Sequence, residues 1–400
     1  MMARSIVLLL VWSLVGAVLP VSAQADDVIR VLLAQDVPRI QISAERRLSV
    51  RGGSGQELVF AAPVTIIAAP DGTVSLNGEP VSSIAGLTVS SGGGGLLLSV
   101  GQGGESYAPP LAMSGTLRVL RGKSPGGLAV VNHVEVEEYV KGVVPAEMNA
   151  AWHPEALKVQ AVVARTYALY QRQANREREY DVAASTQDQV YRGRQGVDQR
   201  VQDAVESTKN LTLTYQNEPI LAAFSSTAAG PTEDAMNVWS KDVPYLKGVD
   251  CPFDANSPYY QWRAEFKLQD LEEKLVRQGL TVGTIANLAP LAYSSAGRVA
   301  RLRILHSQGE LVLRGEDLRR LVGYGVIQST QFEVESIGKT VVLSGRGAGH
   351  AVGLCQWGAK EMADLGYRFD TILRYYFPGT ELKTWRATAQ LSRPQPYSPF

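Results

Sequence analysis

The sequence predicts an α+β protein in which mixed helices and β-sheets form a cleft, with a β-rich amino-terminal region. Short β-prone runs separated by turn residues fill residues 28–120, and no amphipathic helix of useful length occurs among them. From about residue 134 onward, helical and β-prone segments follow one another. A helix expected over 154–173 is apolar around nearly its whole circumference, so we expect it to lie at the centre of the fold.

Further elements follow from local periodicity and from proline positions. Pro145 is expected to end a helix over 135–144, and Pro154 to begin the central helix. The predicted domain boundaries are a signal peptide at 1–23, the β-rich region at 24–120, a main domain at 121–382 with an α/β subregion at 263–340, and a tail at 383–400. Further helices are expected at 202–209, 266–278 and 356–365, and the last of them is followed by a short segment at 371–376. Strands are expected at 211–215, 220–224, 298–306, 310–314 and 341–344.

The first residues predict export. Arg4 precedes an apolar run over 6–19, and small residues up to Ala23 supply a cleavage site, the pattern of a secretory signal peptide. An uncleaved anchor is the alternative, but the run is shorter than the roughly 20 apolar residues that span a bilayer. We therefore expect a protein of the periplasm, cell envelope or extracellular space, with no stable membrane span after cleavage.

The charge balance excludes one class of partner. The 400 residues contain 39 Lys and Arg against 39 Asp and Glu, and 45% of residues are hydrophobic. That content suits a folded protein of about two or three domains. Because proteins that bind nucleic acid recruit phosphate with a positive field, zero net charge and the lack of a basic run argue against such a partner.

Glu147 is the first candidate for chemistry. It follows Pro145 and has Val144, Met148 and Trp152 around it. An apolar setting disfavours the charged form of a carboxyl group and so favours a proton donor near neutral pH. A solvated glutamate near a helix end is the alternative.

Polar residues on the central helix are the second group. Gln160, Arg165 and Tyr167 interrupt an Ala/Val-rich surface, and polar groups buried there need partners. Residues 160 and 167 share a helix face, where they would line a cleft floor. A structural hydrogen-bond network explains them equally well.

Two later segments supply further candidates for ligand binding. Five glycines surround His350, and Gln356 follows at a helix start, although a structural histidine also fits this pattern. Ser225, Ser226 and Thr232 are able to donate to sugar oxygens or merely to cap turns.

Other catalytic classes lack their usual residues. No G-x-S-x-G motif occurs, which argues against a serine hydrolase of that type. The histidines are scattered and the two cysteines lie far apart in the sequence, so we expect neither a metal nor another cofactor.

Five ordered blocks resemble the SpoIID/LytB family, which includes stage II sporulation protein D and an amidase enhancer. The similarity covers roughly 28–382 and is densest from residue 131 onward. The blocks read VVPAEMNAAWHPEALKVQAVVARTYAL, DVAASTQDQVYRG, AFSSTAAGPTEDAMNVW, PYLKGVDCPFD and GRGAGHAVGLCQWGAKEMADLGY.

The resemblance implies a lytic transglycosylase that cuts peptidoglycan glycan strands stripped of their stem peptides. Glu147 matches the family's catalytic glutamate, and Tyr191 lies in the block expected to contact substrate. One carboxyl group suffices because the attacking hydroxyl belongs to the sugar, unlike the two carboxylates of ordinary glycosidases. The alternative is a glycan-binding protein that stimulates an N-acetylmuramoyl-L-alanine amidase without cutting. A hydrolase would need a second carboxylate, such as Asp181, Asp188 or Asp234.

Two departures from the family pattern concern cysteines. Ala183 and Asp188 stand where metal-bearing members have thiols, so the resemblance implies no zinc there. Cys355 replaces the serine usual before Gln-Trp-Gly-Ala, and with Cys251 it suggests a disulfide.

Overall fold

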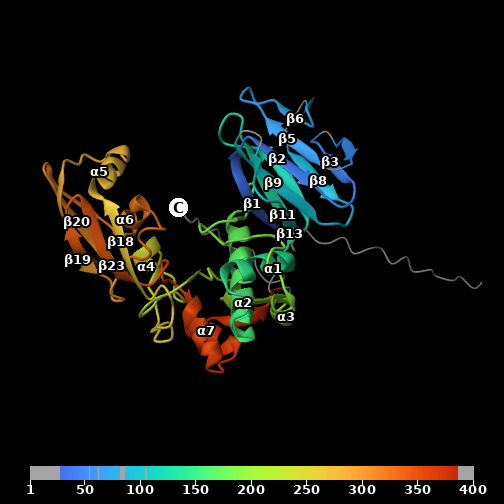
Figure 1. Ribbon diagram of the computed structural model, residues 1–400. Helices are drawn as coiled ribbons and strands as arrows, with labels where there is room; N and C mark the ends of the chain where they lie inside the picture. Colours follow the sequence, from blue (N-terminus) through green and yellow to red (C-terminus); the bar gives the residue numbers. More distant parts are fainter. Residues whose placement is uncertain (1–27, 54, 62, 82–85, 104–105, 386–400) are drawn as a thin grey trace, which may run out of the picture.

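The computed structural model describes residues 28–53, 55–61, 63–81, 86–103 and 106–385, and it confirms the α+β class and the β-rich amino-terminal region (Figure 1). The predicted signal peptide lies outside the described residues, as does the predicted tail beyond residue 385. Within the described ranges, no helix combines the length and the apolar character needed to cross a bilayer.

Two sheets make up the amino-terminal region. The first has the order β14-β1-β13-β12-β8-β3-β4 and the second runs β10-β9-β2-β5-β6-β7, with β11 beside β9. Side chains alternate between buried and less buried along the strands, and the buried ones join one hydrophobic core. The strands are β1 (Val28–Val37), β2 (Arg39–Ser43), β3 (Leu48–Arg51), β4 (Glu57–Phe60), β5 (Val64–Ala68), β6 (Val74–Leu76), β7 (Glu79–Val81), β8 (Leu87–Ser91), β9 (Leu96–Gly103), β10 (Ser106–Tyr107), β11 (Leu111–Met113), β12 (Thr116–Arg121), β13 (Leu128–Glu135) and β14 (Val182–Ala183).

The first sheet ties this region to the rest of the chain. β1 pairs with β13 on one side and, in parallel, with the much later β14 on the other. The predicted boundary between residues 120 and 121 falls inside β12, which forms a hairpin with β13. The amino-terminal strands therefore share a sheet with the segment that leads into the helices.

A helical layer follows, formed by α1 (Val136–Glu147), α2 (Pro154–Ala174) and α3 (Gln199–Ser207). The prediction of a buried central helix is confirmed: α2 is buried from Ala156 to Leu169, except for Lys158, and contacts α1, α3 and later elements. The predicted end of α1 is wrong. Pro145 lies inside the helix, because its missing N–H removes only one bond near the end and the ladder resumes with Met148 N donating to Val144 O at 2.9 Å.

The carboxyl-terminal part returns to this layer. β15 (Leu211–Tyr215) pairs with β16 (Glu218–Pro219) and β25 (Glu381–Thr384), and β17 (Phe224–Ser225) pairs with β24 (Leu354–Cys355). The strand expected over 220–224 is thus reduced to its last residue and Ser225. The helices here are α4 (Ala235–Trp239), α7 (Gln356–Asp364) and α8 (Phe369–Tyr376).

Residues 261–346 form a part with its own hydrophobic core, separated from the amino-terminal sheets in Figure 1. The expected helix over 266–278 begins two residues late, because Phe266 still belongs to β18. The elements are β18 (Gln261–Lys267), α5 (Leu268–Arg277), β19 (Ile285–Tyr293), β20 (Val299–His306), β21 (Gly309–Leu313), α6 (Gly315–Val322), β22 (Phe332–Ile337) and β23 (Thr340–Arg346).

Candidate functional site

Glu147 is the last residue of α1 and is partly exposed. The Val190 N–H donates to its Oε1 at 2.6 Å. The loop that carries Val190 comes close to α1 at Gly142, where a Cβ atom would lie 2.5 Å from Cε2 of Tyr191. A glycine at position 142 therefore allows the close approach that puts a main-chain donor on the Glu147 carboxyl group.

Two glutamines connect Glu147 to other helices. Gln356, at the start of α7, donates from Nε2 to the main-chain oxygen of Glu147 at 3.3 Å and to Oε1 of Gln160 at 3.3 Å. Gln160 is buried on α2, and its own Nε2 has no partner within the described part of the chain. The consecutive helices α1 and α2 thus meet the much later α7 at the candidate catalytic residue.

The electrostatics of Glu147 are unusual for a glutamate. Burial raises its pKa, and the Val190 N–H and the Gln356 amide oppose that rise only in part. No cation forms an ion pair with Glu147 among the described residues. A partly accessible carboxyl group with a raised pKa keeps its proton at higher pH than usual and can give it to a bound group.

Two tryptophans lie close together next to these residues in the sequence. The rings of Trp152 and Trp357 meet edge to face with centroids 5.1 Å apart, and both side chains are partly exposed. Trp357 directly follows Gln356, and Trp152 lies five residues after Glu147. Exposed aromatic rings of this kind offer an apolar surface with a polar edge.

Arg165 does not reach the site, so its prediction as a substrate ligand is wrong. Its Nε and Nη2 donate to the two carboxylate oxygens of Glu137 at 2.9 and 2.6 Å, and Nη1 donates to the Leu211 carbonyl at 3.1 Å. The Arg165 side chain is only 1% exposed. Its role is to fix α2 to α1 and to the start of β15.

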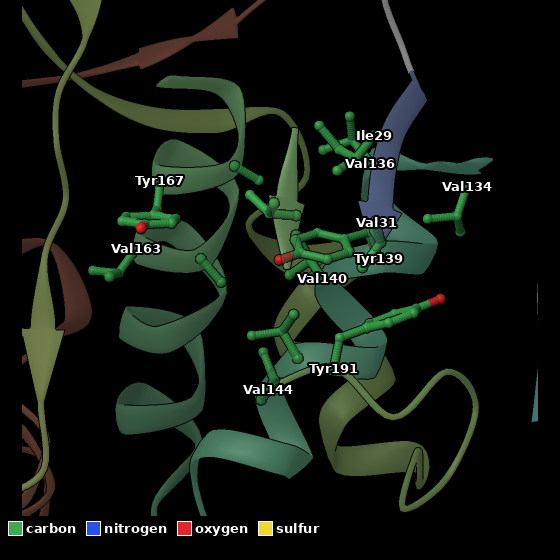
Figure 2. Close-up of a cluster of buried hydrophobic side chains, with 14 of the residues drawn as sticks. Ile29, Val31, Val134, Val136, Tyr139, Val140, Val144, Val163, Tyr167 and Tyr191 are labelled. Atoms are coloured by element: carbon green, nitrogen blue, oxygen red, sulfur yellow. The ribbon is translucent and has the colours of Figure 1, made fainter. Parts of the chain in front are cut away.

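Tyr191 is also wrong as a substrate ligand. Its ring packs 5.2 Å from that of Tyr139, and its hydroxyl donates to Asn132 Oδ1 at 2.9 Å. Figure 2 shows it within a cluster of buried side chains that includes Tyr139 and Val140. Tyr167 is buried too, and its hydroxyl donates to Asp188 Oδ1 at 2.7 Å. The alternative of a structural network therefore describes Tyr167 better than cleft lining.

The hydroxyl candidates mostly serve local structure. Ser225 Oγ accepts from Ala351 N at 3.1 Å, and Thr232 Oγ1 accepts from Val249 N at 2.8 Å; both residues are buried. Ser226 is partly exposed and contacts Thr227 Oγ1 at 3.2 Å. Of the three hydroxyl candidates, Ser226 alone keeps an accessible position for a ligand.

His350 has structural partners. Its Nδ1 accepts from Val352 N at 3.0 Å, and its ring lies 5.0 Å from that of Trp239. Burial, together with the positive charge of Arg319, lowers the pKa of His350 to about 3. The imidazole is therefore neutral at physiological pH, and any contact with a ligand would be that of an uncharged ring.

The three carboxylates considered as partners for Glu147 are engaged elsewhere. Asp181 pairs with Arg30, with Nε donating to Oδ1 at 3.0 Å. Asp188 accepts from Tyr167 and from Ala183 N, and Asp234 caps α4 through Met236 N at 2.8 Å. None of them is among the groups that shift the pKa of Glu147.

The predicted disulfide is not formed in the structure. Cys251 and Cys355 are buried free thiols that lie in one group with Asp254.

A separate cavity of about 560 Å³ contains none of the predicted site residues. It is lined by residues that include Leu32, Leu120, Arg121, Lys123, Val131, Arg178 and Tyr180.

Sequence reasoning missed Val190, because a main-chain donor leaves no signal in residue type. It also missed the role of Glu137, since nothing in the sequence indicates its pairing with a residue 28 positions away. The turn residues that bring Val190 to α1 are a weak signal in the sequence for this contact.

The chain matches known families over two overlapping segments. A family model described as Stage II sporulation protein (SpoIID) matches residues 124–215, and one described as a domain of unknown function (DUF8618) matches 199–353. Glu147, Gln160 and Val190 lie in the first segment, whereas Gln356 lies just beyond the second.

Curated relatives agree with the first match. Stage II sporulation protein D of Bacillus subtilis (strain 168) is 34% identical over 267 residues, covering 63% of this chain and 75% of that protein. An uncharacterized protein of Brachyspira hyodysenteriae is 32% identical over 256 residues, covering 64% and 68%. An amidase enhancer of Bacillus subtilis is 29% identical over 294 residues, covering 62% and 40%.

Proposed function

The chain belongs to the stage II sporulation protein D family, and from that premise we propose that it is an exported lytic transglycosylase of peptidoglycan glycan strands. The observation that carries the proposal is the Glu147 carboxyl group, partly exposed at the end of α1, with a raised pKa and no cation beside it among the described residues. The predicted signal peptide at 1–23 supplies the route to the substrate, and residues 121–382 form the proposed catalytic domain.

The proposed reaction uses Glu147 twice. In its acid form the carboxyl group donates a proton to the glycosidic oxygen between N-acetylmuramic acid and N-acetylglucosamine as the bond from that oxygen to C1 breaks. The resulting carboxylate then accepts the proton of the C6 hydroxyl of the same muramic acid while that oxygen bonds to C1. The product carries a 1,6-anhydro end, and Glu147 is returned to its acid form.

The surroundings of Glu147 support a mechanism with one carboxyl group. A hydrolase would need a second carboxylate to activate water, but Asp181, Asp188 and Asp234 have structural partners. The Val190 N–H stabilises the carboxylate between the two steps, while burial keeps it basic enough to take the second proton.

Accessible groups near Glu147 suit a sugar chain. Trp152 and Trp357 are partly exposed and provide aromatic surface. Gln356 is buried and donates to the main-chain oxygen of Glu147, so in the proposal it positions the end of α1 and does not contact the sugar. Ser226 and His350 remain proposed contacts further out. Since Arg165 is paired with Glu137, it does not bind the lactyl carboxylate, and no cation takes its place in the proposal.

A second candidate is a non-catalytic role. One relative carries the name Amidase enhancer at 29% identity, which favours a glycan-binding partner of an N-acetylmuramoyl-L-alanine amidase. A pure binder has no need for a carboxyl group with a raised pKa, so we place catalysis first.

Product analysis with a Glu147→Gln variant distinguishes these roles. The glutamine keeps an oxygen for the Val190 N–H but cannot donate a carboxyl proton, so we expect cleavage to fall roughly 10²- to 10⁴-fold. Purified glycan strands, with and without stem peptides, are incubated with each protein and the ends identified by mass spectrometry. The matched control is Glu138→Gln on the same helix, a carboxyl group paired with Lys141 that should be dispensable for cleavage.

Each outcome assigns a role. Anhydro ends from the parent and the control, but not from Glu147→Gln, support the lytic transglycosylase. Reducing ends would indicate a hydrolase. No cleavage by any of the three, together with stimulation of an added amidase, would leave the enhancer role, and full activity of Glu147→Gln would remove Glu147 from the mechanism.

A further inference from the structure

Three potential metal ligands meet at one buried point that the proposed glycan chemistry does not use. One ligand atom each from Cys251, Asp254 and Cys355 lie within 4.8 Å of one another. The three residues are 3%, 1% and 1% exposed. Thiol and carboxyl groups gathered inside a core are costly unless they have partners, so this group requires an explanation.

The local backbone explains how the group forms. Cys251 and Asp254 are separated by two residues in one loop, the short spacing typical of paired metal ligands. Cys355 caps the start of α7, where its Sγ accepts from Gly358 N at 3.4 Å and from Ala228 N at 3.3 Å. One donor belongs to the first turn of α7 and the other to a distant segment, so the Cys355 sulfur is held in place from two sides. Burial and the neighbouring Cys251 raise the pKa of the Cys355 thiol, so metal binding has to displace its proton.

Asp254 is the member with an unmet requirement. Its Oδ2 accepts from Ala229 N at 2.7 Å and from the Cys355 thiol at 3.2 Å, but its buried Oδ1 has no partner in the described part of the chain. The nearby Arg298 directs its Nη atoms at the carbonyl oxygens of Ala228 and Pro231, at 2.6 and 2.8 Å. A buried carboxylate oxygen without a hydrogen-bond partner requires an explanation, and a bound metal ion would provide one.

We propose that Cys251, Asp254 and Cys355 bind a divalent, thiophilic metal ion of the zinc class. Zinc accepts thiolate and carboxylate ligands in tetrahedral sites, and the Tyr376 hydroxyl, 3.2 Å from Cys251 Sγ, stands beside the fourth position. Binding releases the two thiol protons. The site then carries one net negative charge, which the buried Arg298 guanidinium is placed to balance.

A disulfide between the same cysteines is the competing chemistry. It would remove two electrons and two protons from the thiols, which requires an external oxidant, and it would leave Asp254 Oδ1 without a partner. A metal ion instead uses all three groups. For this reason the structure favours metal binding over the pairing that the sequence suggested, and over the expectation that the chain lacks a metal site.

The site would stabilise the start of α7. Cys355 directly precedes Gln356, whose amide contacts Glu147 and Gln160. Gly358 lies so close to Cys251 Sγ and the Tyr376 hydroxyl that no Cβ atom fits there, so this helix turn packs directly on the proposed ligands. The ion would thereby be structural and would not take part in the reaction.

Metal binding can be measured without any assay of glycan cleavage. The full-length purified protein, reduced and stripped of metal, is titrated with Co²⁺ and separately with Zn²⁺. We expect one ion per chain by native mass spectrometry and an intense near-ultraviolet thiolate-to-cobalt band. Zinc should also protect both thiols from alkylation and raise the unfolding temperature.

Variants identify the ligands. Cys251→Ser and Cys355→Ser should lose the cobalt band. Asp254→Asn has nearly the same shape as the parent and should bind the metal at least roughly tenfold more weakly, because losing even an outer-shell partner has an effect of that size. The control is Asp250→Asn, an exposed carboxyl group next to Cys251, which should bind as the parent does. Circular dichroism checks that each variant is folded.

Three results would overturn the proposal. One is a folded, reduced parent protein that gives no thiolate-to-cobalt band. Another is protein recovered from its own export compartment with a Cys251–Cys355 disulfide and no metal. The third is unchanged binding by folded Asp254→Asn, which would remove Asp254 and, with it, the three-ligand site.

Discussion

Two glutamates on one helix meet opposite electrostatic conditions. Glu137, in the first turn of α1, accepts two hydrogen bonds from Arg165 and one from Asn210 N at 3.1 Å. Glu147, at the other end of the same helix, receives the Val190 N–H on its carboxyl group and has no ion pair among the described residues. The two residues are ten positions apart. The negative charge of Glu137 is balanced by Arg165, whereas no positive charge is paired with Glu147 among the described residues.

The difference separates a structural carboxylate from the one that we propose to be reactive. Compensation by a bidentate arginine fixes charge and position together, which suits a buried junction between helices. A single main-chain donor fixes the position but lets burial raise the pKa, which suits proton transfer. The comparison makes three predictions, in order of expected effect.

Removing the charge of Glu137 should affect stability most. Glu137→Gln leaves the buried Arg165 guanidinium without its counter-ion, so we expect the free energy of unfolding to fall by about 3–5 kcal/mol. Urea unfolding followed by circular dichroism measures this loss.

The exposed pair of Glu206 with Lys209 supplies the control, since Glu206→Gln should change stability by less than about 1 kcal/mol. The double variant Glu137→Gln with Arg165→Met should recover part of the loss, because it removes both buried charges. A loss as small as that of the surface pair would contradict the structural assignment of Glu137.

Removing the amide of Gln356 should affect catalysis moderately. Gln356→Ala deletes a hydrogen bond of about 1 kcal/mol to the end of α1, so we expect kcat/KM for glycan cleavage to fall roughly fivefold. Steady-state kinetics on purified strands measures it. Gln160→Leu serves as the matched comparison: it removes the other acceptor of the Gln356 amide but leaves the hydrogen bond to Glu147, so kcat/KM should change less. Unchanged kinetics in Gln356→Ala would show that the contact does not position Glu147.

The pH dependence of stability provides the third test. At pH values below the usual glutamate range, Glu147 is protonated in both the folded and the unfolded chain, so its ionisation does not change the free energy of unfolding. As pH rises, the unfolded chain releases this proton more readily than the folded one, because burial raises the folded pKa, so stability is lost. Glu147→Gln should therefore raise Tm at neutral pH and leave it unchanged in acid, as thermal unfolding across this range would show.

Glu155→Gln should behave in the opposite way. Burial alone would raise the pKa of Glu155, but hydrogen bonds from Lys158 and from Phe369 N outweigh it and lower that pKa. This carboxylate stabilises the folded chain above the usual glutamate range and loses that contribution in acid. Its replacement should lower Tm at neutral pH and matter less at low pH. The same sign for both variants would contradict the assignment.

Local signals were sufficient for much of the fold and for Glu147. The central helix, the strand over 211–215 and the helix after Cys355 follow from periodicity, caps and proline positions. Glu147 was identified because a carboxyl group in apolar company is unusual at the level of sequence. The continuation of α1 through Pro145 was not predicted, because the cost of a proline depends on how close the helix end lies.

Long-range pairing accounts for the errors in the site. The sequence does not reveal that Arg165 pairs with Glu137 on another helix, so Arg165 was expected at the cleft. Nor does it reveal that the Tyr191 hydroxyl bonds to Asn132 on a strand, so Tyr191 was expected to contact substrate. Cys251 and Cys355 were paired as a disulfide candidate, but Asp254 was not placed beside them, because its position next to a residue about a hundred positions away depends on the fold. Residue type identified polar groups that need partners, and only the fold decides which partner each one finds.

The parallel pairing of β14 with β1 links the amino-terminal strands to the loop that contacts Glu147. Val182 and Ala183 pair with Val31 and Leu32, and this short strand begins the loop that ends at Val190. A gene fragment encoding only the segment matched to the family, 124–215, would carry Glu147 into a new chain without the strand that seats its hydrogen-bond donor. We therefore expect the segment 124–215 to hold the Glu147 carboxyl group in place only when the amino-terminal strands are present.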